Sequence, residues 1–233
     1  QSTIFPLGKI VDCVSIINTG AKYNDDVFQF SVGLNGVGTK AVNALSSHFR
    51  VVSVRDGKLA EAVFERGNLV SNRSGNAKPG LKNGTYVEFI PDEEIFGKYE
   101  FNQEFIEKRI WNYAYLNAGL TINYNGNDFV SQNGLLDLLQ SELEDSSLYP
   151  MGYYKGKQIE FSFTHSNAYG ENYFSFVNGQ YTSDGGTHLS AFKEGFLKGV
   201  NDFYKKNFKS EDVRDGMTAA VSVKVKEPVF ESQ

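Results

Sequence analysis

The residues of this chain best suited to chemistry are three glycines, Gly33, Gly36 and Gly38, which precede an apolar run from Ala41 to Phe49. The run has the character of a helix. A glycine-rich loop at a helix N-terminus exposes backbone N–H groups at the positive end of the helix dipole, where phosphate groups bind. The glycines therefore predict a phosphate-binding loop or an ordinary turn beside a helix, and alone they do not separate the two.

The order of these residues excludes the two best-known phosphate loops. Gly33 and Gly38 have the P-loop interval, but Thr39-Lys40 follows them. A P-loop needs its lysine before the hydroxyl residue, so that the lysine reaches the terminal phosphates and the hydroxyl holds Mg²⁺. The order G-x-x-G-x-G also differs from the dinucleotide-binding order G-x-G-x-x-G.

Other reactive side chains give no recognisable site. His48, His165 and His188 lie far apart, and none has a partner at metal-ligand spacing, so no metal centre is expected. Cys13 cannot form an internal disulfide, and its apolar helical surroundings predict a small core residue. For His188, which follows Gly185-Gly186-Thr187, a structural hydrogen bond is the favoured interpretation.

Composition indicates a globular chain with a reducing, cytoplasmic location. Of 233 residues, 40% are hydrophobic and 22% charged, and 23 basic against 28 acidic residues give a net charge of −5. This balance argues against a protein whose main task is to wrap DNA phosphates. No run approaches the roughly 18 apolar residues of a membrane span, and the single cysteine favours a reducing compartment.

Hydrophobic periodicity predicts an α+β protein of two domains, residues 1–125 and 126–233. The boundary is placed at the break Asn125-Gly126-Asn127, and Asp56-Gly57 is expected to form a hairpin turn. The polar stretch 71–83 is expected to be an exposed loop. Helices are expected at about 8–19, 38–49, 101–116, 135–143 and 187–207, and strands at about 51–54, 60–65, 85–90, 149–154, 158–165, 171–178 and 218–225.

The string VGLNGVGTKAVNALS at residues 32–46 is followed, in a fixed order, by further short motifs. Together they cover nearly the whole chain from Pro6, and they resemble the B subunits of bacterial type IIA DNA topoisomerases, the GHKL ATPases that serve topoisomerase IV and gyrase. The later motifs are RDGK at 55–58, GTYVEF at 84–89, LNAG at 116–119, GGTHL at 185–189, EDVRDGM at 211–217 and FESQ at 230–233.

This resemblance implies a fold and a function. The first part would be the C-terminal portion of a GHKL-type ATPase α/β sandwich that carries the ATP lid, and residues 126–233 a transducer domain with a ribosomal-protein-like α+β fold. In the family, ATP with Mg²⁺ closes a homodimer of B subunits and drives DNA strand passage, together with a topoisomerase A-type subunit that carries the DNA-cleaving tyrosine. Such enzymes work in the cytoplasm, associated with the nucleoid.

The resemblance also assigns nucleotide-binding residues position by position. Lys22 would approach the nucleotide from the lid, Thr85 would bind adenine through water, and Gln233 would reach the γ-phosphate from the transducer. Without the resemblance, Thr85 is a strand former and Lys22 a solvated lysine. The lid residues, whose backbone N–H groups would bind the triphosphate, are Gly33, Leu34, Asn35, Gly36, Val37 and Gly38.

No catalytic residue of the family maps onto this sequence. The general-base glutamate, the Mg²⁺-holding asparagine and the adenine-binding aspartate all precede the family's match to Pro6-Leu7-Gly8-Lys9, and a lysine follows the glutamine matched by Gln233. The expectation is an N-terminally truncated ATPase region without activity of its own. The alternatives are a non-catalytic scaffold or dimerisation module, and another GHKL ATPase such as a mismatch-repair protein or chaperone.

Overall fold

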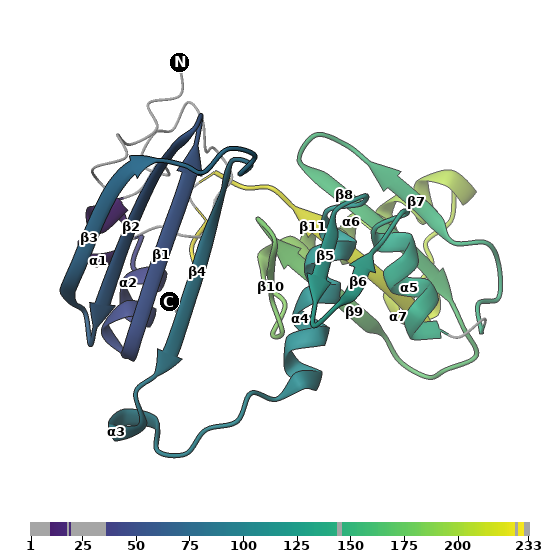
Figure 1. Ribbon diagram of the computed structural model, residues 1–233. Coiled ribbons are helices and arrows are strands. Elements are labelled where there is room, and N and C mark those ends of the chain that lie inside the picture. The colour runs from purple at the N-terminus through teal and green to yellow at the C-terminus, as the bar shows by residue number, and fades with distance from the viewer. Residues whose placement is uncertain (1–9, 18, 20–35, 144–145, 227, 231–233) are drawn as a thin grey trace. The chain divides into compact units, whose positions relative to one another are not determined.

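The computed structural model describes residues 10–17, 19, 36–143, 146–226 and 228–230. The chain divides into two compact units, residues 1–101 and 102–233 (Figure 1). This division comes earlier than the boundary predicted at residue 125. The reason is that helix α4 (Gln103–Leu116) packs within the second unit, where Trp111 contacts the ring of Phe129 and Tyr115 joins the core around Leu135.

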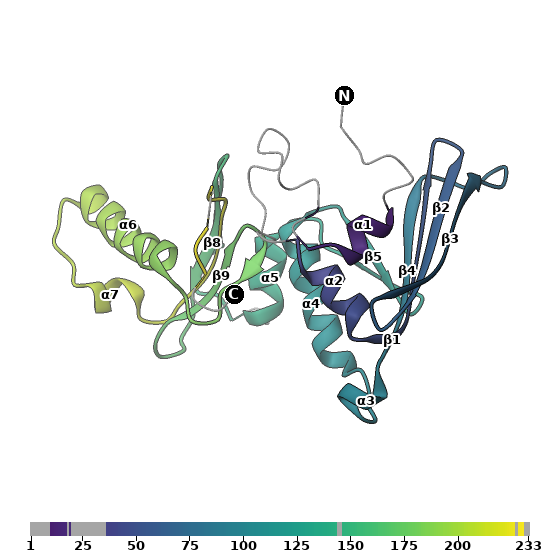
Figure 2. The same ribbon diagram turned by 90° about the vertical axis from the view of Figure 1, so that its left-hand side faces the viewer.

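The first unit is built on a four-stranded antiparallel sheet in the order β3-β2-β1-β4. Helices α1 (Ile10–Ser15) and α2 (Gly38–Ala44) both contact strands of this sheet, as Figure 2 shows. A short helix, α3 (Glu93–Phe96), follows the last strand, and the Asp92 side chain caps it by accepting from the backbone N–H of Glu94. The strands are β1 (Ser46–Arg55), β2 (Lys58–Glu65), β3 (Asn68–Asn76) and β4 (Gly84–Pro91).

The two faces of this sheet differ because side chains alternate along each strand. On the helix-bearing face, Phe49 and Val51 are fully buried and pack against Val14 of α1. On the other face, Glu61 accepts from Arg50 Nε at 2.6 Å and is also paired with Arg73. Hydrogen bonds from these arginines lower the pKa of Glu61 below its usual range.

Two sequence predictions about the first unit are wrong. The helix expected at 38–49 ends at Ala44, because β1 begins at Ser46 and takes Phe49 into the sheet core. The expected loop at 71–83 contains most of β3, which pairs with β2 through its backbone. Every residue of β3 is exposed, so this edge strand has no apolar alternation from which it could be predicted.

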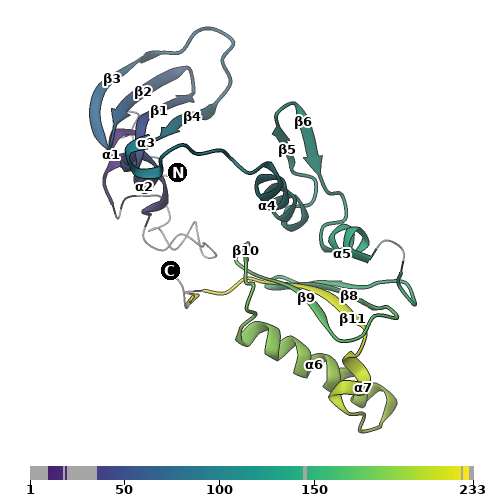
Figure 3. The same cartoon turned by 90° about the horizontal axis from the view of Figure 1, so that it is seen from below.

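The second unit contains a five-stranded sheet in the order β10-β9-β11-β8-β7, with helices on both faces (Figure 3). All neighbouring pairs are antiparallel except β9 and β11, which run parallel and are connected through α6 and α7. A two-stranded hairpin, β5 and β6, lies beside α4. The elements are β5 (Thr121–Tyr124), β6 (Asn127–Val130), α5 (Leu135–Leu143), β7 (Gly152–Lys155), β8 (Ile159–His165), β9 (Asn172–Val177), β10 (Gln180–Tyr181), α6 (Thr187–Tyr204), α7 (Ser210–Arg214) and β11 (Met217–Val223).

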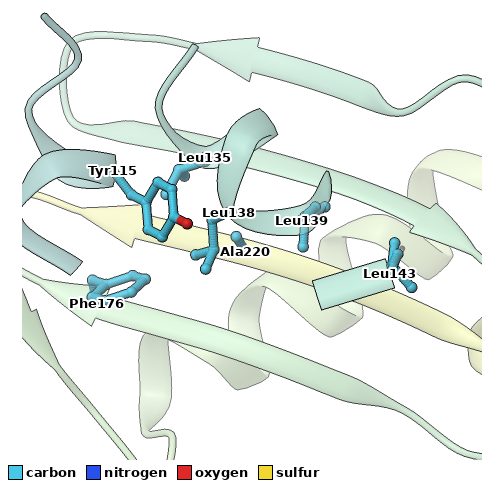
Figure 4. Packing of buried hydrophobic residues seen from close by; sticks show 7 residues of the cluster. All are labelled: Tyr115, Leu135, Leu138, Leu139, Leu143, Phe176 and Ala220. Atoms are coloured by element: carbon cyan, nitrogen blue, oxygen red, sulfur yellow. The ribbon is translucent and has the colours of Figure 1, made fainter. Parts of the chain in front are cut away.

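Burial on both faces explains the composition of the central strand. Ala220 of β11 faces the leucines of α5 in the cluster of Figure 4, which comprises Tyr115, Leu135, Leu138, Leu139, Leu143, Phe176 and Ala220. Ala219 and Val221 face the other way and pack with Phe192 of α6. A strand covered on both sides carries apolar residues at consecutive positions, as Ala219, Ala220 and Val221 do. The helices predicted at 101–116, 135–143 and 187–207 and the strands predicted at 158–165, 171–178 and 218–225 are confirmed with small shifts of their ends.

Candidate nucleotide-binding site

The start of α2 carries the described part of the predicted lid. Gly36 has φ +56°, and a Cβ atom there would lie 2.7 Å from the carbonyl oxygen of Thr19, so only glycine fits. Gly38 begins the helix, and a Cβ atom there would meet nothing within 4 Å. The first glycine is therefore needed for the backbone path, whereas the second leaves open space beside the helix start.

The backbone of residues 36–38 belongs to none of the described strands. The carbonyl of Val37 accepts the first intrahelical bond of α2, from the backbone N–H of Ala41 at 2.9 Å. The N–H groups that precede this bond have no acceptor within the helix, as at any helix N-terminus. Such groups suit an anion.

From the sequence, Lys40 was considered only because its position after Thr39 excludes a P-loop. Its side chain is buried, with the residue 9% exposed, and Nζ donates to the carbonyl oxygen of Thr19 at 2.9 Å. Nζ would also lie 3.6 Å from a Cβ atom on Gly36. A buried ammonium beside the first turn of α2 adds positive charge to the end of the helix where a phosphate would bind.

Asn43 and Cys13 join α1 and α2. The Asn43 amide, 1% exposed, donates to the carbonyl oxygen of Val14 at 2.9 Å, while its own oxygen has no partner among the described residues. Cys13 packs against the core of this unit, and burial raises the pKa of its thiol. Cys13 is only partly buried, so it lies at the border of the core in which it was predicted, and its surroundings favour the protonated thiol.

Thr85 lies on β4, directly opposite Ser53 of β1. Paired residues of an antiparallel ladder point to the same face, and by alternation this is the face where Val51 is buried beneath the helices. Thr85 is itself exposed, as are its neighbours on that face, Val87 (47%) and Phe89 (42%). The far end of β4 joins the end of α2, where Asp92 N–H donates to the carbonyl of Leu45. No described hydrogen bond connects Thr85 with Gly36, Val37 or Gly38.

The remaining predicted site residues, Lys22, Gly33, Leu34, Asn35 and Gln233, lie outside the described residues. The chain shortly before Gln233 is described as far as Phe230. Pro228, Val229 and Phe230 line a cavity of about 430 Å³ together with the loop of Gly185, Gly186 and His188. The imidazole of His188 is hydrogen-bonded to Thr182 Oγ1 at 3.2 Å, which confirms the predicted structural contact, and burial lowers its pKa.

Metal chemistry finds no support in the described part of the chain. It contains no group of three or more His, Cys, Asp or Glu side chains that could hold a metal ion. No described helix is long and apolar enough to cross a membrane.

Comparison with known proteins gives consistent relatives. Residues 127–233 match the family described as DNA gyrase B. The chain is 60% identical over 229 residues to the B subunit of DNA topoisomerase 4 from Borreliella burgdorferi, an alignment that covers 98% of this chain and 38% of that protein. It is 33% identical over 254 residues to the B subunit of DNA gyrase from Helicobacter pylori, covering 99% of this chain and 33% of that protein.

A solved structure extends the likeness to the fold. The 43K ATPase domain of Thermus thermophilus gyrase B, determined in complex with an aminocoumarin, matches with a TM-score of 0.73 at 29% identity, covering 95% of this chain and 62% of that one. The chain spans about a third of the length of the curated relatives it matches. The predicted α+β fold and family are confirmed. This chain is a homologue of the ATPase region of type II DNA topoisomerase B subunits, with topoisomerase IV and gyrase among its relatives.

Proposed function

We propose that this chain works within a type II topoisomerase B subunit, in which ATP binding and hydrolysis close a dimer and drive DNA strand passage. The observation that carries the proposal is the 60% identity to a topoisomerase 4 B subunit across 98% of the chain. The partners are a second B subunit, an A-type subunit and DNA, in the cytoplasm at the nucleoid. Bound ATP supplies the triphosphate whose hydrolysis drives the cycle.

The start of α2 binds the triphosphate in this proposal. Gly36, Val37 and Gly38 present backbone N–H groups, and Gly33, Leu34 and Asn35 extend the same lid. The positive φ of Gly36 and the open space beside Gly38 support this role, because phosphate oxygens approach glycine backbones closely. Lys22 approaches the nucleotide from the lid.

The adenine and the γ-phosphate are contacted elsewhere. Thr85 binds adenine through water from the helix-bearing face of the first sheet, and its exposure leaves the hydroxyl free to do so. Gln233 reaches the γ-phosphate from the second part of the chain. In this proposal residues 1–125 belong to the ATPase domain and 126–233 to the transducer. The match of 127–233 to the gyrase B family supports this division, although residues 102–125 pack in the second compact unit.

The isolated chain does not hydrolyse ATP in this proposal. None of the catalytic residues that the family resemblance implies maps onto this sequence. A positioned general base alone contributes about 10²- to 10⁴-fold to such reactions. The residues present bind and orient the nucleotide, and no catalytic residue is assigned here.

A comparison of this chain with the full-length gene product tests the proposal. We expect ATP turnover and, with the A-type subunit and Mg²⁺, ATP-dependent relaxation or decatenation of DNA by the full-length protein only. Gly36→Ala in the full-length protein should abolish both activities. A full-length protein that is folded and dimeric but neither binds ATP nor changes DNA topology would instead identify a scaffold. Turnover by the isolated chain would contradict its proposed inactivity.

A further inference from the structure

Asn178 and Gly179 form the turn between β9 and β10. Both residues have positive φ, +51° and +87°. Two-residue hairpin turns of type I′ require this, and Asn-Gly is a favoured sequence for them. The turn alone would therefore explain an asparagine at this position.

Other hairpins of the chain show that such a turn does not need the asparagine amide. The turns at Asp56-Gly57, Arg66-Gly67 and Asn125-Gly126 also have positive φ at both residues. Asp, Arg and Asn all serve at the first position. Asn125 is the closest comparison, because it forms the same Asn-Gly turn while its side chain makes no hydrogen bond within the described residues.

Asn178 differs because both polar groups of its side-chain amide form hydrogen bonds with the backbone of another segment. Its Nδ2 donates to the carbonyl oxygen of Val225 at 2.9 Å, and its Oδ1 accepts from the N–H of Val225 at 2.8 Å. Its own N–H donates to the carbonyl of Val223 at 2.9 Å. The parallel pairing of β9 with β11 ends at Val177 and Val223, so the side-chain amide of Asn178 holds the chain two residues beyond the end of β11.

The clamped residue is where the chain leaves the sheet. On the opposite side, Lys224 N–H donates to the carbonyl of Gln158 at 2.7 Å, so the exit is held from both sides. Beyond it, Pro228 is buried, and Pro228 to Phe230 form one wall of the cavity lined by Gly185, Gly186 and His188. The described chain is therefore held at Val225 and again at Pro228 to Phe230.

We propose that Asn178 is a positioning residue that fixes the chain at Val225 and thereby the approach of Gln233 to the γ-phosphate. The inference rests on the proposed function, because Gln233 has that role only there. Asn178 touches no nucleotide and acts through Val225. Without the clamp, the segment occupies its bound path for a smaller fraction of the time, which weakens the contribution of its contact in proportion.

The first test measures hydrogen exchange in this chain carrying Asn178→Gly, with Asn125→Gly as the matched control. Glycine keeps the positive φ of each turn, so only the side-chain hydrogen bonds differ. We expect the Val225 amide to exchange about tenfold faster in Asn178→Gly and at the original rate in Asn125→Gly. Unchanged exchange at Val225 would overturn the proposal.

If Asn178→Gly also loosens β11, Asn178→Asp replaces it. The aspartate keeps an acceptor for the Val225 N–H and loses the donor to the Val225 carbonyl. We expect faster exchange at residues 225–230 with unchanged protection of β11. If the aspartate variant protects residues 225–230 from exchange as well as the unsubstituted chain does, the result would count against the clamp.

The second test uses the full-length gene product and calorimetry with ADP and a non-hydrolysable ATP analogue. We expect Asn178→Gly to weaken binding of the analogue about fivefold and to leave ADP binding within about twofold, because only the analogue carries a γ-phosphate group. Faster exchange at Val225 with an unchanged ratio of the two affinities would show that Asn178 has a structural role only. If the unsubstituted protein binds neither nucleotide, the proposed function itself fails, and this outcome is distinct from failure of the clamp.

Discussion

Replacement of Gly36 by alanine tests the local geometry on which the lid depends. An L-residue at φ +56° is strained by about 1–2 kcal/mol. The new Cβ atom would also lie 2.7 Å from the Thr19 carbonyl oxygen, which cannot move without loosening the 2.9 Å bond that it accepts from Lys40 Nζ. Loss of that bond adds about 1 kcal/mol. We therefore expect Gly36→Ala to destabilise the first unit by about 2–3 kcal/mol.

Gly38→Ala is the matched control. It lies two residues away, begins α2, and has open space around its Cβ position. Alanine in a helix is favoured over glycine by about 0.5–1 kcal/mol, so this variant should be neutral or slightly more stable.

Hydrogen exchange of the β1 and β2 amides measures the difference. At about 1.4 kcal/mol for each factor of ten, Gly36→Ala should speed exchange by roughly 30- to 150-fold where the amides exchange through unfolding of the unit. Gly38→Ala should leave the rates unchanged or slow them. Equal exchange in Gly36→Ala and the unsubstituted chain, or equal destabilisation by both substitutions, would refute the reasoning.

Three further predictions concern cores and charges. Leu139→Ala should destabilise the second unit by about 2–5 kcal/mol, because Leu139 is fully buried. As a control, substitution of the exposed Glu142 on the same helix by alanine should change stability by less than about 0.5 kcal/mol. Urea unfolding followed by the fluorescence of Trp111 measures both effects. Glu61→Gln should cost the first unit about 1 kcal/mol at pH 7. The pKa of Glu61 is lowered in the folded state, so its contribution to stability is present above its unfolded pKa and is lost as the pH falls through the folded pKa. The unfolding free energies of the two proteins, measured by urea titration, should therefore converge in acid. Burial lowers the pKa of His188, so the unfolded chain takes up a proton first as the pH falls below about 6.5, and His188→Gln should lose less stability than the unsubstituted chain between pH 7 and pH 5 in the same titration.

The sequence predicted the second unit better than the first, for physical reasons. Helix α5 carries four buried leucines at helical spacing, and such a pattern has one interpretation. Strand β3 is exposed throughout and mostly polar, and it is held by backbone pairing with β2 and by the ion pair between Arg73 and Glu61, so periodicity gave no sign of it. The end of α2 was missed because Phe49 follows Leu45 at helical spacing, although Phe49 lies on β1.

The candidate site was predicted in part. The glycines predicted a phosphate-binding loop or a turn before a helix, and the positive φ of Gly36 and the neighbouring Thr19 carbonyl show that only glycine fits at that position. The burial of Lys40 could not be predicted, because it depends on Thr19, which is distant in sequence. The hydrogen bonds of Asn178 were missed for the same reason, since an Asn-Gly pair indicates a turn and says nothing of Val225.

The place of β11 in its sheet has a consequence for synthesis on the ribosome. This strand is the last of the sheet in sequence, yet it lies between β8 and β9 and contributes to the cores on both faces. Until residue 223 has left the exit tunnel, β8 and β9 have no partner between them, and the apolar sides of α5 and α6 have no complete surface to cover. We therefore expect the nascent second unit to complete its sheet and both of its cores only in a late step of synthesis.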